Sequence, residues 1–440
     1  MNNIYNYLLP VALKVKFEVK TYSFELLLAL VLLTLPLHYR YNSIALILLS
    51  LYAVVNGKLQ NFKNCKTIFL LVLFYFLSVL SLLWTIDLSA SMQSLSKQSA
   101  FFLIPFIFYI HPLKTAFQKQ KILHFFSFGM FLFCVFYLLR ALIRFLLFKN
   151  PAVFFYHDLV TQEVNAIYVS VYVIIAFFIY YTNSKKTKFD AVVQLILFFT
   201  LILLSSKNLI IVFFILLFIG QFMFFNTKTK QKYFFIISAL FLLITAVFFN
   251  KIKERFLIEI ESNTSQVTIN KEAQKSGFVI YNVSVSRAWN ANHFEPYDYF
   301  TGTSLRVYQL RVFIELMTEN NKWFTGFGTN ATDSKIAQKA HHYNLDRGYG
   351  TFNFHNQYIQ TFAEIGIFGL VIIIIMLILN IKNAFVNKDF IQFSFAVVMI
   401  SLFLSESFFS RVRGVVFFSL LFCIFNQFYQ DKTTNQQHQP

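Results

Sequence analysis

The stretch Phe354-His355-Asn356-Gln357-Tyr358-Ile359-Gln360-Thr361-Phe362-Ala363-Glu364-Ile365-Gly366-Ile367-Phe368-Gly369-Leu370 joins a long polar segment to an apolar one. A helix that begins near Asn356 carries four polar side chains spaced three or four residues apart, which places them on one face. They are Gln357, Gln360, Thr361 and Glu364. The chain beyond them, as far as Leu379, is almost entirely apolar, so this polar stripe ends partway along the helix. Such a stripe at the mouth of a membrane helix predicts the floor of a cavity that is open to one side.

His355 stands directly before this helix. Its imidazole exchanges a proton near neutral pH, and the neighbouring Asn356 and Gln357 both donate and accept hydrogen bonds. The residue types alone fit two interpretations: the general base of an active site, or a polar cap at a membrane interface.

The composition places the chain among membrane proteins. It contains 57% hydrophobic and 13% charged residues and has a positive mean hydropathy, which excludes a soluble enzyme. The net charge of +18 comes mainly from short basic clusters between apolar runs, where such residues orient a protein in the bilayer. We therefore expect membrane lipid, and no nucleic acid, as a partner.

The sequence predicts no metal or other cofactor. Cys65, Cys134 and Cys423 form no CxxC pair, and the adjacent His341 and His342 lie in a loop without nearby acidic or cysteine ligands. No Asp-x-Asp pair is present to hold a divalent ion against a sugar phosphate.

Twelve apolar runs are candidates to cross about 30 Å of hydrocarbon. They lie near residues 21–38, 42–57, 67–85, 101–112, 122–147, 165–182, 190–205, 208–226, 232–250, 358–381, 390–408 and 413–428. The basic loops 58–66, 114–121, 185–188, 228–232 and 382–388 then all fall on one side. The positive-inside rule makes that side cytoplasmic, together with both termini. The first run lacks a small-residue cleavage site, so we expect a membrane span and not a removable signal.

We therefore expect an all-α integral membrane protein with about 12 transmembrane helices and one large outer loop. Its predicted parts are a bundle of helices one to nine in 1–250, the loop in 251–356, helices ten to twelve in 357–430 and a disordered cytoplasmic tail in 431–440.

One amphipathic helix is predicted inside the loop, near the membrane surface. Its apolar side consists of Leu305, Val312, Phe313, Leu316 and Met317. We expect Ser304 as its N-cap, Gln309 on its polar side and Asn320-Asn321 at its end. Residues 263–299 show no clear period and are predicted to be irregular.

Two motifs carry a resemblance to a known family. The pattern His355-Asn356, nine intervening residues, Gly366, two intervening residues and Gly369 resembles the signature of the bacterial O-antigen ligase and O-antigen polymerase superfamily. Thr303-Ser304-Leu305-Arg306, a helix and then Gly326-Phe327-Gly328 resemble the second loop motif of that family. The likeness covers roughly residues 300–425 well and the earlier chain only in topology.

The resemblance implies a glycosyltransferase-C-like fold in the bacterial inner membrane. It also implies a reaction at the periplasmic face, in which a glycan on undecaprenyl pyrophosphate passes to an acceptor hydroxyl. The missing Asp-x-Asp pair favours a metal-independent transfer. Pyrophosphate leaves without needing a proton, so the site requires cations and one base. His355 is the candidate base. Arg306 is the candidate pyrophosphate ligand, because the planar arginine fork matches phosphate oxygens; the alternative for Arg306 is a lipid headgroup contact.

Further residues are candidates for substrate binding. They are Asn356, Gln357, Glu364, Arg311, Arg411, Arg413, Lys207 and Arg140. Arg411 and Arg413 lie in the turn Ser410 to Gly414, which resembles a family element, and Lys207 stands where family members more often carry arginine. Arg140 shares a helical face with Arg144, and its alternative role is to extend toward the membrane surface.

Three functions are compared. A ligase, which transfers the glycan to a lipid-linked acceptor such as the lipid A core, is favoured because the resemblance around His355 and Ser410 to Gly414 is closest to O-antigen ligase-like sequences. A polymerase of O-antigen or exopolysaccharide is the alternative. A transporter of lipid-linked oligosaccharide is less favoured, because it predicts ionisable residues deep in the membrane and two related halves.

Overall fold

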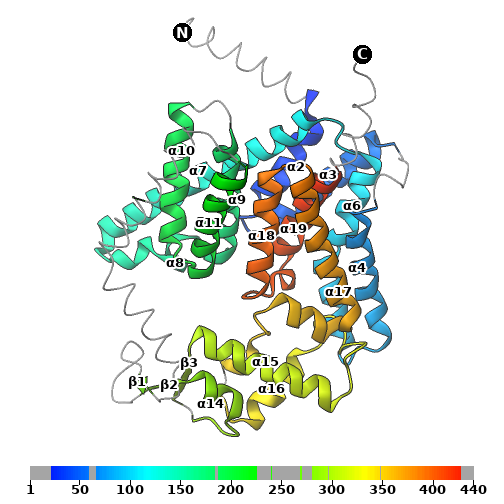
Figure 1. The fold of residues 1–440 in the computed structure, drawn as a ribbon, viewed down its shortest axis with the longest axis vertical. Coiled ribbons are helices and arrows are strands. Elements are labelled where there is room, and N and C mark those ends of the chain that lie inside the picture. The colour runs from blue at the N-terminus through cyan, green and yellow to red at the C-terminus, as the bar shows by residue number, and fades with distance from the viewer. Residues whose placement is uncertain are drawn as a thin grey trace, which may run out of the picture.

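The structure is a computed structural model that describes residues 21–58, 66–183, 187–224, 239, 268–269, 280–295, 297–346 and 348–427. A bundle of helices forms most of the molecule, and a smaller unit lies at one end of it (Figure 1). The turn between α17 and α18 lies at the opposite end of the bundle (Figure 1). Cys65, the loop 228–232, the tail 431–440 and all of the predicted ninth span near 232–250 except residue 239 lie outside the described residues.

The bundle helices are α2 (Ser23–Leu33), α3 (Tyr39–Asn56), α4 (Phe69–Leu80), α5 (Leu88–Gln98), α6 (Ala100–Ile110), α7 (Ala116–Phe148), α8 (Tyr156–Leu159), α9 (Ala166–Thr182), α10 (Lys188–Leu203), α11 (Lys207–Ile219), α17 (Gln357–Val386), α18 (Phe390–Phe403) and α19 (Val412–Gln427). The smaller unit holds β1 (Thr268–Ile269), β2 (Tyr281–Val283), α14 (Val285–Asn290), β3 (Asp298–Phe300), α15 (Gly302–Glu319) and α16 (Asp333–His342). Short 3₁₀ turns connect several helices, among them η6 (Phe408–Ser410) before α19.

Local sequence signals explain where the helices begin. The Thr115 hydroxyl accepts a hydrogen bond from the Gln118 N–H, and the Gln118 side chain accepts one from the Thr115 N–H, which is a capping box at the start of α7. Thr187 and Asp190 repeat this arrangement at α10. Asp389 caps α18 by accepting hydrogen bonds from two backbone N–H groups.

Two helices occupy the centre of the bundle. Nearly every residue of α9 from Ala166 to Tyr181 is buried, and α19 is buried from Gly414 to Gln427. Helices that are apolar all round belong in such positions. The outer helix α7 instead exposes Leu132, Leu139 and Ile143 on its outward face. An apolar outer surface of this kind is expected where lipid replaces water, so the molecule is a helical membrane protein.

Eleven of the twelve predicted spans overlap a helix of the described chain, because long apolar runs are local signals. Three of the described helical segments are long and apolar enough to cross a membrane: Ala116–Phe148, Lys207–Phe224 and Gln357–Val386. The shorter apolar helices have 10 to 17 residues, so the longest of them extends about 26 Å at 1.5 Å per residue. The number of helices that cross the bilayer therefore stays a prediction.

The smaller unit, called the loop unit below, has its own hydrophobic core, formed by described residues between 283 and 363. Its buried members include Val283, Phe294, Tyr308 and Phe313, and the core extends to Ala363 on α17. The division predicted at residue 356 thus falls inside a packed region, since the first turns of α17 complete the core of this loop unit. The predicted loop residues 251–267 and 270–279 lie outside the described residues.

Three predictions about the loop unit need correction. Residues 263–299 were expected to be irregular, yet their described part forms α14 and a sheet of order β1-β2-β3, antiparallel between β1 and β2 and parallel between β2 and β3. The N-cap of α15 is Thr301, whose hydroxyl accepts from the Ser304 N–H. Gln309, expected on the polar side, is buried, and its amide donates to the Asn353 carbonyl.

The apolar side of α15 faces protein. Val312, Phe313 and Leu316 lie in the core of the loop unit, although the sequence placed this helix on the membrane surface. Asn320 ends the helix as predicted.

Candidate functional site

The functional region is the junction at which the loop unit meets the bundle. Here α17 is not continuous, because Ile365 and Gly366 have non-helical backbone angles and Gly366 has φ +71°. The polar stripe therefore belongs to a short first segment, and the apolar remainder of α17 continues beyond the break. The break explains physically why the stripe ends at Glu364.

The turn Gly326-Phe327-Gly328 holds this break. The Phe327 N–H donates to the Ala363 carbonyl and the Gly328 N–H to the Glu364 carbonyl, both at 2.8 Å, and the Ile367 N–H donates to the Trp323 carbonyl at 3.1 Å. Backbone groups that a kinked helix leaves without partners are thus satisfied by the turn. The two sequence motifs that resemble the family are in direct contact.

Glycine is required on both sides of this contact. A Cβ atom on Gly366 would lie 1.9 Å from the Phe324 carbonyl oxygen, and one on Gly326 would lie 2.4 Å from the Glu364 carbonyl oxygen. Both residues also have positive φ, a conformation that glycine adopts at little cost. This close contact between the two backbone segments fixes the position of the first segment of α17 and of His355 before it.

His355 and Asn356 form the entrance to α17. The helix starts near Asn356, as predicted; Asn356 is its N-cap, and the side chain accepts from the Ile359 N–H at 3.1 Å. His355 has φ +44°, and its N–H donates to the Asn353 side chain. A histidine at positive φ is uncommon and is maintained only where the surroundings over-determine it.

The His355 side chain meets the loop that follows α18. Its Nδ1 lies 4.0 Å from Oε2 of Glu406, and the side chains are 33% and 16% exposed. Arg306 reaches the same loop, with one N–H donating to the Ser405 carbonyl at 3.3 Å and another to Gly302 in its own helix. The structure therefore brings Arg306, His355 and Glu406 together from three separate parts of the chain.

The charges of this cluster are tuned mainly by burial. Burial lowers the pKa of His355, and the nearby Arg306 guanidinium lowers it further. Burial raises the pKa of Glu406 to about 7, although Arg306 and Arg411 act in the opposite direction. The histidine is consequently neutral at pH 7, the form that accepts a proton.

The polar stripe is confirmed as one face of α17, but that face is buried against protein. Gln357 donates to the Thr361 hydroxyl and accepts from the Phe409 N–H. Gln360 donates to Glu364 at 2.6 Å and accepts from the Phe354 N–H. The four side chains line a small cavity of about 10 Å³, which has room for about one water molecule. The stripe thus ties α17 to its neighbours next to His355.

The remaining candidate cations are placed unequally. Arg411 is exposed and acts electrostatically on Glu406, so it belongs to the cluster. Lys207 begins α11, and the next residue, Asn208, is hydrogen-bonded to Ser405 in the loop before Glu406. The start of α11 is therefore packed against this loop.

Three further candidate arginines form hydrogen bonds to protein groups away from His355: Arg311, Arg140 and Arg413. Arg311 pairs with Glu315 and donates to Tyr343 and the Ala291 carbonyl inside the loop unit. Arg140 donates to the carbonyls of Leu159 and Val160. Arg413 donates to the carbonyls of Leu37 and Glu163. None of these contacts brings the guanidinium groups to His355.

Glu406 is the member of the cluster that the sequence did not single out. The sequence feature that could have identified Glu406 is an acidic residue in an otherwise apolar run, five residues before Arg411. Its partner His355 is 51 positions away, and sequence spacing carries no information about such a contact.

These features define a polytopic helical membrane protein whose loop unit and bundle together build a polar cluster at one end. Residues 159–374 match the model of a family described as O-antigen ligase. This match supports assignment of the chain to the O-antigen ligase and polymerase superfamily. The matched region contains Arg306, His355, Gly366 and Gly369 and ends before Glu406. No curated protein matches the chain.

Proposed function

We propose that the protein transfers a glycan from undecaprenyl pyrophosphate to the hydroxyl of a lipid-linked acceptor, in the manner of an O-antigen ligase. The observation that carries this proposal is the cluster of His355, Glu406 and Arg306 at the junction of loop and bundle. The matched family consists of glycosyltransferase-like enzymes, and this match supports the proposed class of reaction.

In the proposed reaction the acceptor oxygen attacks the anomeric carbon while its proton passes to Nε2 of neutral His355. The bond between the anomeric carbon and the pyrophosphate oxygen breaks, and pyrophosphate leaves with the electron pair. Nδ1 of His355 faces Glu406, whose carboxylate stabilises the imidazolium that forms. Arg306 and Arg411 are the proposed cations for the departing pyrophosphate, since guanidinium groups bind phosphate oxygens through several N–H donors.

The proposal includes an orientation. The loop unit and the cluster face the periplasm. The start of α7, which holds Lys119 and Lys121, and the turn that holds Lys388 face the cytoplasm, as does each terminus. Donor and acceptor then reach the cluster from the outer leaflet. No divalent metal takes part in the proposed reaction.

A polymerase shares the donor, the base and the orientation and differs in its acceptor. The single long loop supports a ligase, because a polymerase must hold a growing glycan as well as the next repeat unit. The deciding measurement is the glycan profile of a deletion strain. Long chains retained on the lipid carrier, with bare acceptor, support the ligase, whereas acceptor that carries one repeat unit identifies a polymerase.

A further inference from the structure

Glu364 is a buried carboxylate at the break of α17. The residue is 8% exposed and lies at the inner end of the polar stripe. In the part of the chain that the structure describes, its carboxylate forms hydrogen bonds but no ion pair, and the charged group that acts on it is another carboxylate, Asp333. Burial of a carboxylate without a cation lowers stability. The presence of Glu364 therefore needs a reason other than charge pairing.

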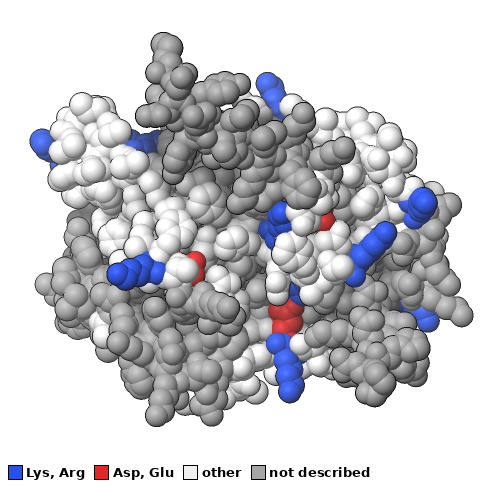
Figure 2. Space-filling model, turned by 90° about the horizontal axis from the view of Figure 1, so that it is seen from above, with Lys and Arg blue, Asp and Glu red and all other residues white. Residues whose placement is uncertain are grey.

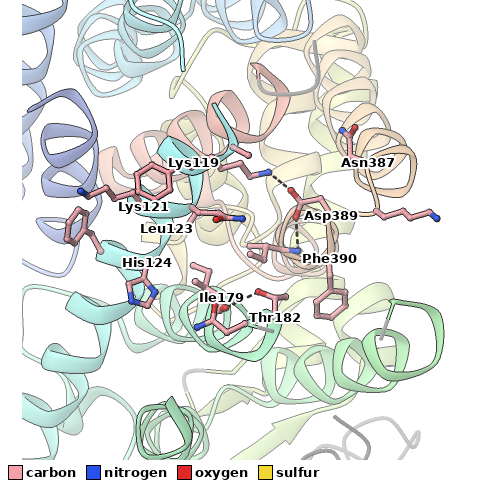
Figure 3. Close-up of a pocket in the computed structure, with 16 residues that line it drawn as sticks. Lys119, Lys121, Leu123, His124, Ile179, Thr182, Asn387, Asp389 and Phe390 are labelled. Atoms are coloured by element: carbon pink, nitrogen blue, oxygen red, sulfur yellow. Dashed lines mark hydrogen bonds and ion pairs between the residues drawn. The ribbon is translucent and has the colours of Figure 1, made fainter. Parts of the chain in front are cut away.

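A carboxylate at the opposite end of the bundle has a cation beside it. Asp389 forms an ion pair with Lys119, which joins the start of α18 to α7 (Figure 3). On that end face, lysine and arginine side chains outnumber acidic ones among the coloured residues (Figure 2). Glu364 lies in different surroundings, so its role follows from its hydrogen bonds.

A chain of hydrogen bonds connects Glu364 with the residue before His355. The Gln360 amide nitrogen donates to Oε1 of Glu364 at 2.6 Å, and the Gln360 carbonyl oxygen accepts from the Phe354 N–H at 3.2 Å. An ionised carboxylate only accepts and a backbone N–H only donates, so the two contacts fix the orientation of the Gln360 amide. Phe354 is 1% exposed and belongs to the core of the loop unit. The backbone just before His355 is thus held by α17 on one side and by that core on the other.

Glu364 is also bonded to the segment that contains the glycine turn. Its backbone carbonyl accepts from the Gly328 N–H at 2.8 Å, and a backbone hydrogen bond from Asn330 reaches its carboxylate. One residue therefore joins the turn that holds the helix break to a hydrogen-bond relay, which runs from Glu364 through Gln360 to Phe354.

His355 has a conformation that needs this support. Its φ of +44° is uncommon for histidine, and such a conformation persists only where the surroundings over-determine it. The relay ends one residue before this position, and Nδ1 of His355 lies 4.0 Å from Glu406. A displacement of the Phe354 backbone therefore changes the direction in which the imidazole points.

We propose that Glu364 is a positioning residue for His355 and that it acts through the Gln360 amide and the Phe354 backbone. This inference rests on the proposed function, in which His355 is the base. The carboxylate accepts from the amide, and the amide then presents its oxygen to the Phe354 N–H, which keeps the imidazole directed toward Glu406. This role differs from the substrate binding that was expected for Glu364 from the sequence.

An exchange of the two side chains tests the relay. In Glu364→Gln, residue 364 offers one accepting atom where the carboxylate offered two, so the Asn330 and Gln360 donors compete for it and one donor faces an N–H group. The second change, Gln360→Glu in the same chain, supplies the missing acceptor, because residue 360 then accepts from both Phe354 and the new amide. The double variant has the native total charge and the same number of hydrogen bonds, in reversed order.

The readout is the rate at which diethyl pyrocarbonate modifies the His355 imidazole in the purified full-length protein, followed by mass spectrometry of the peptide that contains it. The His355 side chain is 33% exposed in the native arrangement. Loss of one hydrogen bond to a charged group is worth about tenfold or more in an equilibrium. Glu364→Gln should therefore raise the modification rate by up to about tenfold, and the double variant should return to the native rate.

The measurement has internal standards and a matched control. His341 and His342 are exposed in α16 and should be modified at the same rate in every variant. Glu319→Gln makes the same chemical change at a side chain of the loop unit that is 55% exposed, and it should leave the His355 rate at the native value. All proteins are compared below the Tm of the least stable variant, so that global unfolding does not contribute.

Glycan transfer is measured on the same variants and should fall in Glu364→Gln and recover in the double variant. A native His355 modification rate in Glu364→Gln, or a raised rate that the double variant does not reverse, would overturn the relay. A raised rate with unchanged glycan transfer would leave the relay standing and refute His355 as the base. Failure of the relay and failure of the proposed reaction therefore give different results.

Discussion

The contact between Gly366 and the turn Gly326-Phe327-Gly328 gives the sharpest structural prediction. Gly366→Ala introduces a Cβ that would lie 1.9 Å from the Phe324 carbonyl oxygen, at φ +71° and ψ −168°. A residue other than glycine in that region costs about 1 to 3 kcal/mol. Relief of the clash separates the turn from α17.

The separation has a second cost. Three backbone hydrogen bonds join α17 to the segment from Trp323 to Gly328, and each contributes about 0.5 to 1.5 kcal/mol. The lower limits together amount to about 2.5 kcal/mol, or about 70-fold in the equilibrium between the native and displaced arrangements. His355 lies eleven residues before Gly366 on the same segment, so it moves away from Glu406.

The assay compares glycan transfer and Tm in a strain whose only copy is the variant. Gly366→Ala should lower both while the protein remains in the membrane. Gly348→Ala is the control, since a Cβ on Gly348 has no heavy atom within 4 Å and the residue lies in the same loop unit. Normal transfer and normal Tm in Gly366→Ala would refute the role given to this contact.

Four further predictions concern the proposed site. His355→Ala should lower transfer by about 10² to 10⁴ at an unchanged membrane level, and near-normal transfer would remove His355 from the mechanism. Arg306→Lys should lower transfer about tenfold or more through the lost fork geometry, and transfer by the native protein should survive EDTA; rescue by divalent ions after EDTA would contradict a metal-free reaction. The transfer rate should rise with pH as His355, whose pKa lies below its ordinary 6.5, loses its proton. It should rise again near pH 7 as Glu406 ionises. The Glu406→Gln variant should lose the second rise, and an unchanged pH profile in this variant would argue against the role of Glu406. A reporter fused near Asn320 should register the periplasm, and a cytoplasmic signal there would reverse the proposed orientation.

The orientation is a prediction from the sequence, and the placement of two lysines agrees with it. Lys119 and Lys388, from two of the predicted cytoplasmic loops, line one cavity at the end opposite to the loop unit. They share one end of the bundle, as a single cytoplasmic side requires.

Local patterns account for what the sequence predicted correctly. Apolar runs of helical length indicate helices wherever they occur. The helix start near Asn356 was predictable because an N-cap acts on backbone groups only two or three residues away. The one-faced stripe from Gln357 to Glu364 follows from helical spacing alone. These features depend on neighbours within about one or two turns.

The functions of those features depend on contacts between distant segments. The polar stripe packs against η6 and does not line a wide cavity. The Phe409 N–H, 52 residues from Gln357, donates to the Gln357 side chain and makes this contact. Arg311 carries the same charge as Arg306, yet the fold directs it to Glu315 and Tyr343, inside the loop unit. The proximity of His355 to Glu406 and the break at Gly366 arise only when the glycine turn supplies backbone donors to α17. Sequence therefore determined the helices and the candidate base, and the tertiary structure decided which polar groups meet it, because long-range backbone packing sets those distances.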